Sequence, residues 1–569
     1  MPIRQARSGI SDNGKVERSH LTDELEFYQL LDYTDDVDLR AKRAVWEEFY
    51  NVHRPHAAFG RRTPTRFSVR RWRREQRQAK SGDAQPHVVR RGTMGHGAEG
   101  AASAVPGLGR VAASRATEFP IGFNLIGHLT SRTGLGAGAR MTLSLIHSRG
   151  WDLAITDIET RGIDARVPLP VNGLPVVALG GGPASVNLLH MNPWQLMYAM
   201  FLMDADMVSR LGLRFLACVP YWELEEFPQH WIEVLRAMDV VLAPTKFIAE
   251  AVERAVCDQP DRPDVIYFMQ STPVREGVIA DRSRWFAGRE DRVVYLSSFD
   301  FSSDAARKNP MAVLEAFEQA FRGRDDVALA FKTGHAMQPE AIAARNELSR
   351  RAAEDGRVVL IEEQLTDAEM SSLLASADVY VSLHRSEGLG LGMMESMALG
   401  VPVIATGWSG NMDFMDDQNS IPVAFSMVPI DGSYHPEYRN MKKRLRWAEP
   451  DIESAVRAMR DLADDASRRA ALADAARAAM KARWIEYEKA TALGDVLRLA
   501  GSGDWVEPHR RRVRRLGVAV RRRSQSPSRL ILEFKKFVVA RLRRAGLKPP
   551  PPPGERPAGP WCEIDPYSL

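Results

Sequence analysis

The chain has 569 residues and a formal net charge of +4, with 44% hydrophobic and 26% charged residues. These proportions are ordinary for a soluble globular protein of several domains, and no run of about 18 apolar residues predicts a membrane-spanning helix. Its three cysteines, Cys218, Cys257 and Cys562, are too far apart for a disulfide framework or a cysteine zinc site, and the start carries no apolar secretory signal, so we expect a cytoplasmic protein.

The positive charge is concentrated in two flanking segments. Residues 61–91 carry eleven Lys and Arg side chains against two acidic ones, and residues 510–548 carry fifteen against one. The rest of the chain is therefore acidic, and we expect no specific nucleic-acid partner. The basic run 69–80 could hold nucleic acid nonspecifically, but a solvated basic helix is the simpler interpretation.

Two stretches within the first 80 residues resemble the same family of proteins. SDNGKVERSHLTDELEFYQ (residues 11–29) and WEEFYNVHRPHAAFGRRTPTRF (residues 46–67) resemble the C-terminal end of an integrase-type transposase. The resemblance implies that Glu17 is the last of three metal-binding carboxylates, and two-metal chemistry needs the other two. We therefore expect a truncated integrase remnant over residues 1–80 without transposase activity. The alternative is a helical extension with chance similarity.

The middle of the chain begins after a Gly/Ala/Ser-rich stretch at 92–109, which predicts a flexible linker over 81–118. Short apolar runs then alternate with helical patterns. The expected strands are 122–127, 151–156, 175–179, 186–191, 215–222, 240–245 and 265–270 in a first series, and 293–299, 327–333, 358–363, 379–384 and 402–406 in a second. Apolar strands separated by helices predict parallel sheets covered on both faces. The two series predict an α/β fold of two doubly wound, Rossmann-like domains facing each other across a cleft.

The most informative stretch is HRSEGLGLGMMESMALGVPVIATGWSGN, residues 384–411. Its pattern predicts a buried strand, a loop with three alternating glycines (Gly388, Gly390 and Gly392) and a short helix over 393–399. Such glycines let a backbone approach a ligand, and the N–H groups at a helix start attract phosphate or sugar oxygens.

Two glutamates frame this loop. Glu387 precedes it and Glu395 follows on the helix, with seven residues between them. Carboxylates would repel a phosphate but accept hydrogen bonds from the hydroxyls of a sugar or a ribose. The alternative is an ordinary β-loop-α unit with two solvated glutamates.

This motif resembles the signature of the retaining family 4 glycosyltransferases, which have the GT-B fold. Residues 299–317, 331–334 and 447–462 resemble parts of that family's C-terminal domain, and residues 122–140 and 221–231 resemble the N-terminal domain of a bacterial subgroup. The resemblance covers roughly 119–500. It implies an acceptor domain over 119–285 and a nucleotide-sugar donor domain over 286–500, including trailing helices.

The resemblance implies roles for the motif residues. Glu387 would hydrogen-bond the donor sugar as a catalytic residue, Glu395 would hold the ribose hydroxyls, and Lys308 would neutralise the departing diphosphate. The backbone N–H groups of Gly388, Leu389, Gly390 and Leu391 would surround the sugar and the diphosphate.

Two further cations are phosphate candidates. The family usually has an arginine about six residues before the lysine, where this chain has Ser302. Arg307 is a possible substitute, and the alternative is that its side chain faces solvent. Lys332 ends a strand, although a solvated lysine is the simpler interpretation there.

The N-terminal domain contributes weaker candidates. Gly134 and Gly136 follow the first strand, and the resemblance places such a loop over the phosphates and the reacting carbon. His190 resembles a histidine that some members use near the donor sugar or acceptor, and a purely structural role is the alternative. His128 and Glu223 are weaker candidates of the same kind, whereas His384 is expected to orient the loop rather than transfer a proton.

The implied reaction moves a sugar from a nucleotide-diphosphate donor to a glycan or lipid-linked acceptor with retention of configuration. A phosphate oxygen of the leaving group helps take the acceptor proton, and the protein supplies charge and positioning. No Asp/His cluster of metal-binding spacing occurs, so we expect neither a metal nor another cofactor beside the nucleotide sugar.

Two alternatives to this enzyme stay open. One is a non-catalytic scaffold derived from a GT-B enzyme. The other is a dinucleotide-dependent oxidoreductase, in which Gly134-x-Gly136-x-x-Ala139 would bind the dinucleotide and Asp157 its ribose. The long connection before Gly134 and the absence of a hydride-acceptor motif argue against the second.

Residues 501–569 form a basic segment and a proline-rich tail at 549–560. HRRRVRR (509–515) and RLILEFKKFVVARLRRAGLK (529–548) are typical of a helix lying on an anionic membrane surface. We therefore expect a cytoplasmic enzyme that is peripheral at the inner membrane face. The alternative is a helix packed back on the body with a solvated basic face.

Overall fold

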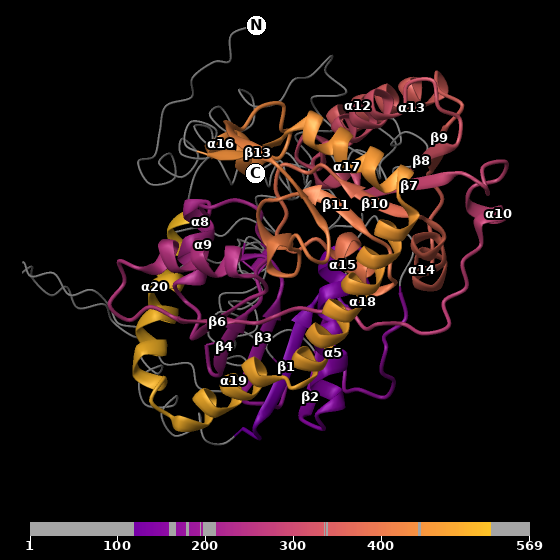
Figure 1. The fold of residues 1–569 in the computed structure, drawn as a ribbon. Coiled ribbons are helices and arrows are strands. Elements are labelled where there is room, and N and C mark those ends of the chain that lie inside the picture. The colour runs from indigo at the N-terminus through magenta and orange to yellow at the C-terminus, as the bar shows by residue number, and fades with distance from the viewer. Residues whose placement is uncertain are drawn as a thin grey trace, which may run out of the picture. The chain divides into compact units, whose positions relative to one another are not determined.

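The structure is a computed structural model that describes residues 119–158, 167–177, 181–193, 195–196, 212–334, 336, 339–441 and 445–524. Within these ranges the chain forms two six-stranded sheets and one two-stranded sheet, with helices around them (Figure 1). The integrase-like segment, the predicted linker and the tail after residue 524 lie outside the described residues.

The first sheet belongs to residues 119–285, the N-terminal half. Its parallel strands lie in the order β2-β1-β3-β4-β5-β6. They are β1 (Gly122–Gly127), β2 (Asp152–Asp157), β3 (Val186–His190), β4 (Phe215–Cys218), β5 (Val240–Ala243) and β6 (Asp264–Tyr267), and the helices are α5 (Gly134–Ser148), α8 (Gln229–Leu235) and α9 (Lys246–Val256). Within the run predicted at 175–179, Val176 is exposed and forms only an isolated bridge to Ile155 of β2, and residues 178 and 179 lie outside the described residues.

The second sheet belongs to residues 286–500, the C-terminal half, and its parallel strands lie in the order β12-β11-β10-β7-β8-β9. The strands are β7 (Val293–Phe299), β8 (Val327–Thr333), β9 (Val358–Ile361), β10 (Val379–Ser382), β11 (Val403–Thr406) and β12 (Ile421–Val423). The helices are α10 (Arg282–Trp285), which leads into this half, η4 (Phe301–Ser303), α11 (Ala305–Lys308), α12 (Pro310–Ala320), α13 (Pro339–Ala353), α14 (Asp367–Ser376), α15 (Leu391–Ala398) and η5 (Gly410–Asp413). The prediction of two Rossmann-like parallel sheets is confirmed.

The strands follow from their apolar sequences. Every residue of β3, β4 and β5 is buried, because helices cover both faces of the sheet. Side chains from both faces therefore contribute to the core around each sheet.

The helices start at capping residues: the Thr133 side chain accepts the Gly136 N–H, and Thr366 forms a capping box with Glu369.

An unpredicted arm follows β12. It consists of the antiparallel strands β13 (Phe425–Pro429) and β14 (Arg446–Pro450) with α16 (Pro436–Met441) between them. Tyr438 and Trp447 of this 425–450 arm pack in one core cluster with Trp222 and Trp231 of the N-terminal half. The arm therefore joins the C-terminal half to the N-terminal half.

The helices after the arm cross between the halves. They are α17 (Ile452–Asp464), α18 (Ala466–Glu488), α19 (Thr491–Ser502) and α20 (Val506–Ser524). Met459 of α17 packs in the core of the second sheet, whereas Leu493 and Val496 of α19 pack in the core of the first. Figure 1 shows α18 running from beside α15 to α19, next to the strands of the first sheet.

Part of the basic C-terminal segment packs on the N-terminal half. In α20, His509 Nδ1 lies 2.8 Å from Asp239 Oδ2, and Arg512 forms an ion pair with the same buried carboxylate. Residues 509–515 therefore lie in a helix that packs on the body, which was the alternative to a membrane-surface helix. Residues 529–548 lie outside the described residues. Among the described helices, none is both long and apolar enough to cross a membrane.

Candidate active site

The predicted site residues follow the carboxyl ends of the central strands. β7 and β10 are neighbours, and the chain leads from them in opposite directions, to β8 and to β11. Parallel sheets bind ligands at such a switch point, outside the carboxyl ends of the strands. Residues 300–308 follow β7 and residues 383–391 follow β10, and β1 and β3 form the corresponding point of the first sheet.

The loop after β10 is fixed by hydrogen bonds. The fully buried His384 contacts Asn411 Oδ1 through Nε2 at 3.1 Å, and the Glu387 N–H donates to Ser409 Oγ at 2.8 Å. Burial lowers the pKa of His384, so its ring is neutral and acts as a hydrogen-bonding support for the loop.

Two glycines allow the turn into α15. Gly390 caps the helix with a φ of 90°, a left-handed conformation that favours glycine. At Gly388 a Cβ would lie 3.0 Å from the Trp222 carbonyl oxygen, so the loop passes close to the N-terminal half. The helix predicted at 393–399 starts earlier, at Leu391, because the third glycine of the loop belongs to its first turn.

Glu387, Lys308, Arg307 and Glu223 form what we term the charged cluster. Lys308 Nζ donates to Glu387 Oε1, and Arg307 Nη1 lies 3.4 Å from the same oxygen. Burial by itself would raise the pKa of Glu387, but Lys308 and Arg307 outweigh it and lower the pKa to about 2. The Glu387 carboxylate is therefore ionised at neutral pH.

Arg307 is buried rather than facing solvent. Its side chain is 4% exposed, Nη1 donates to the Ser386 carbonyl at 2.8 Å, and Nη2 donates to the Ser303 carbonyl at 3.0 Å. Nη2 also lies 3.5 Å from Glu223 Oε1. These oxygens surround the guanidinium, so Arg307 holds Glu387 in place from the buried side of the cluster. The Lys308 side chain is more accessible, with 20% of its surface exposed.

Glu395 differs from Glu387 in its surroundings. Among the described residues, its carboxylate has no hydrogen bond or ion pair, although the charges of Arg275, Asp367 and Arg140 act on it. Burial raises its pKa to about 7; Arg275 and Arg140 oppose this shift, and Asp367 adds to it. An unpaired carboxylate in this position can accept hydrogen bonds from a ligand's hydroxyls.

The loop after β1 meets this site from the N-terminal half. A Cβ on Gly134 would lie 3.7 Å from Leu391 Cδ1, so the first turns of α5 and α15 approach each other. Arg132 Nη1 donates to the Leu365 carbonyl at 3.0 Å. At Gly136 a Cβ would lie 2.1 Å from the Ser131 carbonyl oxygen, so this turn requires glycine.

His190 is fully buried at the end of β3. Neither ring nitrogen has a hydrogen-bond partner among the described residues, and burial lowers its pKa to about 3. Its ring centroid lies 5.6 Å from that of Tyr221, whose hydroxyl is also unpartnered within the described chain. Tyr221 was not identified as a candidate from the sequence, because the apolar run 215–222 predicts a strand there. In the structure β4 ends at Cys218, and Tyr221 lies in the loop that follows.

The remaining candidates have local partners. Lys332 Nζ donates to the Thr333 carbonyl at 2.7 Å. Asp157 accepts from the Thr130 N–H at 3.2 Å and from the Thr130 hydroxyl at 2.5 Å. His128 Nδ1 lies 2.8 Å from the Ile158 carbonyl oxygen. The engagement of Asp157 counts against the dinucleotide alternative, which needs that carboxylate for a ribose.

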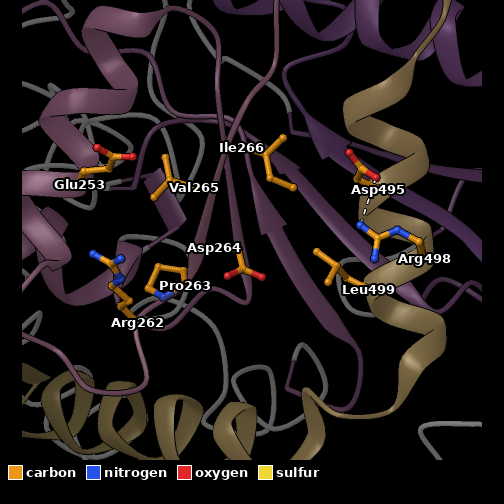
Figure 2. A pocket seen from close by; sticks show the side chains of 9 residues that line it. All are labelled: Glu253, Arg262, Pro263, Asp264, Val265, Ile266, Asp495, Arg498 and Leu499. Carbon is orange, nitrogen blue, oxygen red and sulfur yellow. Dashed lines mark hydrogen bonds and ion pairs between the residues drawn. The ribbon is translucent and has the colours of Figure 1, made fainter.

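A separate hollow of about 450 Å³ lies elsewhere (Figure 2). It is lined by Glu253, Arg262, Pro263, Asp264, Val265, Ile266, Asp495, Arg498 and Leu499. Asp264 is the first residue of β6, so the hollow lies at the amino edge of the first sheet, opposite the switch point. Among the described residues no group of three or more His, Cys, Asp or Glu side chains could hold a metal ion.

Residues 220–492 match the model of the family 4 glycosyltransferases in conflict systems, and residues 6–64 match that of the integrase core domain. No curated protein matches the chain.

Several solved structures are similar to the chain. HepE of Anabaena in complex with UDP and glucose is 13% identical with a TM-score of 0.49, over 66% of this chain and 99% of that chain. A UDP-forming trehalose-phosphate synthase from Burkholderia xenovorans is 12% identical with a TM-score of 0.42, over 55% and 74%. The pneumococcal O-GlcNAc transferase GtfA is 16% identical with a TM-score of 0.40, over 55% and 57%.

The family match includes the second sheet and the complete loop from Glu387 to Glu395. Residues 220–492 are therefore similar to family 4 glycosyltransferases, within a chain whose described residues form two Rossmann-like parallel sheets, and residues 6–64 are similar to an integrase core domain.

Proposed function

We propose that the protein transfers a sugar from a nucleoside-diphosphate sugar to a hydroxyl of a glycan or lipid-linked acceptor, with retention of anomeric configuration. The observation that carries the proposal is the ionised Glu387 beside Lys308, in the loop that leads into α15, together with the approach of the first turn of α15 to that of α5. A carboxylate binds sugar hydroxyls, while the adjacent ammonium group and helix start attract phosphate.

The donor binds with its diphosphate between the first turns of α5 and α15. Gly134 and Gly136 supply one side and residues 388–391 the other, and Lys308 neutralises the charge of the leaving diphosphate. Glu395 accepts the ribose hydroxyls, because its carboxylate has unused hydrogen-bonding capacity. Arg307 acts through Glu387, and a phosphate contact by Lys332 stays a prediction.

In the reaction, the bond between the anomeric carbon and the diphosphate oxygen breaks as the acceptor oxygen bonds to the same face. The acceptor proton passes to an oxygen of the departing phosphate. Glu387 orients the sugar ring, and a sugar contact by the neutral, fully buried His190 stays a prediction. Positioning and charge stabilisation supply most of the rate enhancement in such a mechanism.

A lipid-linked acceptor is favoured by the basic and apolar composition of residues 529–548, which is typical of segments that bind anionic membranes. The acceptor would then be reached at the inner face of a membrane.

Replacement of Glu387 tests the proposed function. Wild-type protein should release nucleoside diphosphate from at least one member of a panel of UDP-, GDP-, ADP- and dTDP-sugars. Glu387→Ala should reduce this turnover by about 100-fold or more. Because it also removes a partner of the buried Arg307, it should lower the thermal unfolding temperature, and turnover is therefore compared well below that temperature. The exposed Glu315→Ala in α12 is a matched control that should retain full turnover. Wild-type rates in Glu387→Ala, or no donor consumed by wild-type protein, would contradict the proposal.

A further inference from the structure

The charged cluster contains one residue from the N-terminal half. Glu223 lies in the loop after β4, whereas Arg307, Lys308 and Glu387 belong to the C-terminal half. The side chains of Glu223, Lys308 and Glu387 are 24%, 20% and 10% exposed, respectively, and that of Arg307 is 4% exposed. Three charges therefore border the solvent-accessible side of the cluster, with Arg307 beneath them.

The position of Glu223 is fixed from two sides. Its Oε2 accepts the Tyr438 hydroxyl of the 425–450 arm at 2.8 Å, and its Oε1 lies 3.5 Å from Arg307 Nη2. Its backbone carbonyl accepts the Ser386 hydroxyl. Glu223 is thus held directly against the segment that carries Glu387.

Arg307 is shared between two carboxylates. Nη1 faces Glu387 at 3.4 Å and Nη2 faces Glu223 at 3.5 Å. Asp304, the other acidic group acting on Arg307, is 1% exposed and is engaged by Ser433 and the Ala306 N–H. Replacement of Glu223 therefore changes the charge of the cluster while Glu387 stays in place.

We infer that Glu223 is a positioning residue that balances the charge of the donor site. It draws Arg307 partly away from Glu387, so that the Glu387 carboxylate keeps its capacity for sugar hydroxyls, and it limits the attraction of the site for the diphosphate product. The inference rests on the proposed function, and it names the N-terminal half as the source of this control.

The charge of the cluster gives the inference a distinctive consequence. Two carboxylates, one guanidinium and one ammonium sum to a formal charge of zero, whereas Glu223→Gln leaves an excess of one positive charge. A nucleoside diphosphate is an anion and should bind the variant more tightly, while turnover should fall. A residue that only supports the fold would weaken binding and turnover together.

Calorimetric titration with UDP, GDP, ADP and dTDP, combined with donor turnover, tests this inference. Glu223→Gln should lower the Kd of the nucleotide that wild-type protein binds by about threefold or more at low ionic strength, and this gain should shrink with added salt. Its kcat should fall by about tenfold. Glu223→Asp restores the charge and should return the Kd to the wild-type value.

Two matched variants separate charge from packing. Tyr438→Phe removes the hydroxyl partner but no charge, so the Kd should stay unchanged. Glu226→Gln removes an exposed charge from the same loop and should change neither Kd nor kcat. An unchanged or higher Kd in Glu223→Gln, with wild-type protein binding and consuming donor, would overturn the inference alone. Wild-type protein that neither binds any of the four nucleotides nor consumes a donor would overturn the proposed function and the inference with it.

Discussion

Glu387 and Glu395 lie on one loop and helix, yet their pKa values shift in opposite directions. Both carboxylates lose water on folding, which raises a carboxyl pKa. Glu387 has Lys308 in direct contact and Arg307 at 3.4 Å, and these two cations together more than offset burial. Glu395 has only more distant cations, so its desolvation cost is not offset in the absence of a ligand.

Glu395→Gln should stabilise the free protein and weaken nucleotide binding. The folded-state pKa of about 7 exceeds the ordinary value of 4.5, so stability falls as pH rises from about 4.5 to 7 and stays lowered above that. At about 1.4 kcal/mol per pH unit, and discounted for partial exposure, Gln should raise the free energy of unfolding at pH 8 by about 1–3 kcal/mol. Denaturant unfolding at pH 5 and pH 8 measures the difference.

Nucleotide binding provides the second measurement for Glu395. In wild-type protein the Kd for a nucleoside diphosphate should rise as pH falls below about 7, because protonation removes an acceptor for the ribose hydroxyls. The Gln variant should bind more weakly at every pH and lose this dependence. The exposed Glu363→Gln serves as control. Equal stability of the Glu395 variant and wild-type protein at pH 8 would contradict the assigned environment.

The sequence identified Glu387, Glu395 and Lys308 as candidate site residues, but it did not predict the directions of the neighbouring side chains. The spacing of Glu387 and Glu395 is visible in one short segment, because the loop and the helix are local structures. Arg307 could not be assigned to the buried side, since its direction depends on Ser386 and Glu223, which come from distant parts of the chain. Residue identity is local information, whereas side-chain environment is set by tertiary contacts.

At the level of elements, strands buried on both faces were predicted best. β7 and β8 have the predicted bounds, because each strand begins with an apolar run that is buried in the sheet. The arm strands β13 and β14 were missed: β13 contains no fully buried residue and ends at Pro429, so it lacks the apolar run of a covered strand. Its pairing with β14 depends on residues that lie 17 to 25 positions further along the sequence.

The turn between β1 and α5 yields a prediction for two glycines. A Cβ at Gly136 would meet the Ser131 carbonyl at 2.1 Å, whereas one at Gly134 would make only an ordinary contact with Leu391. Gly136→Ala should therefore lower the free energy of unfolding by about 1–3 kcal/mol, and Gly134→Ala should leave it within about 0.5 kcal/mol. Urea unfolding of both variants tests the turn. Equal stability of the two would show that the backbone at 136 has room to relax.

At the scale of the whole described domain, segments that follow the second sheet in sequence complete the core around the first sheet. Leu493 and Val496, which follow the second sheet in sequence, are buried with Phe123 and Leu188 of the first. Trp447 of the 425–450 arm packs in the cluster that contains Trp222. Neither half can bury its apolar surface alone, so folding should couple them. The sequence pattern predicted trailing helices but not that they pack against the first sheet, because the apolar face of a helix does not identify the surface on which it packs.

Leu493→Ala should destabilise the first sheet although the residue lies more than 200 positions beyond its last strand in the sequence. Leu493 is fully buried, and removal of such a side chain costs about 2–5 kcal/mol through lost burial and the cavity left behind. Hydrogen exchange should therefore accelerate at the amides of β1 and β3 as well as in α19. The exposed neighbour Thr491→Ala provides the control, with exchange in β1 and β3 as in wild-type protein. Rapid exchange confined to α19 would show that this helix only lies on the first sheet and that the halves fold independently.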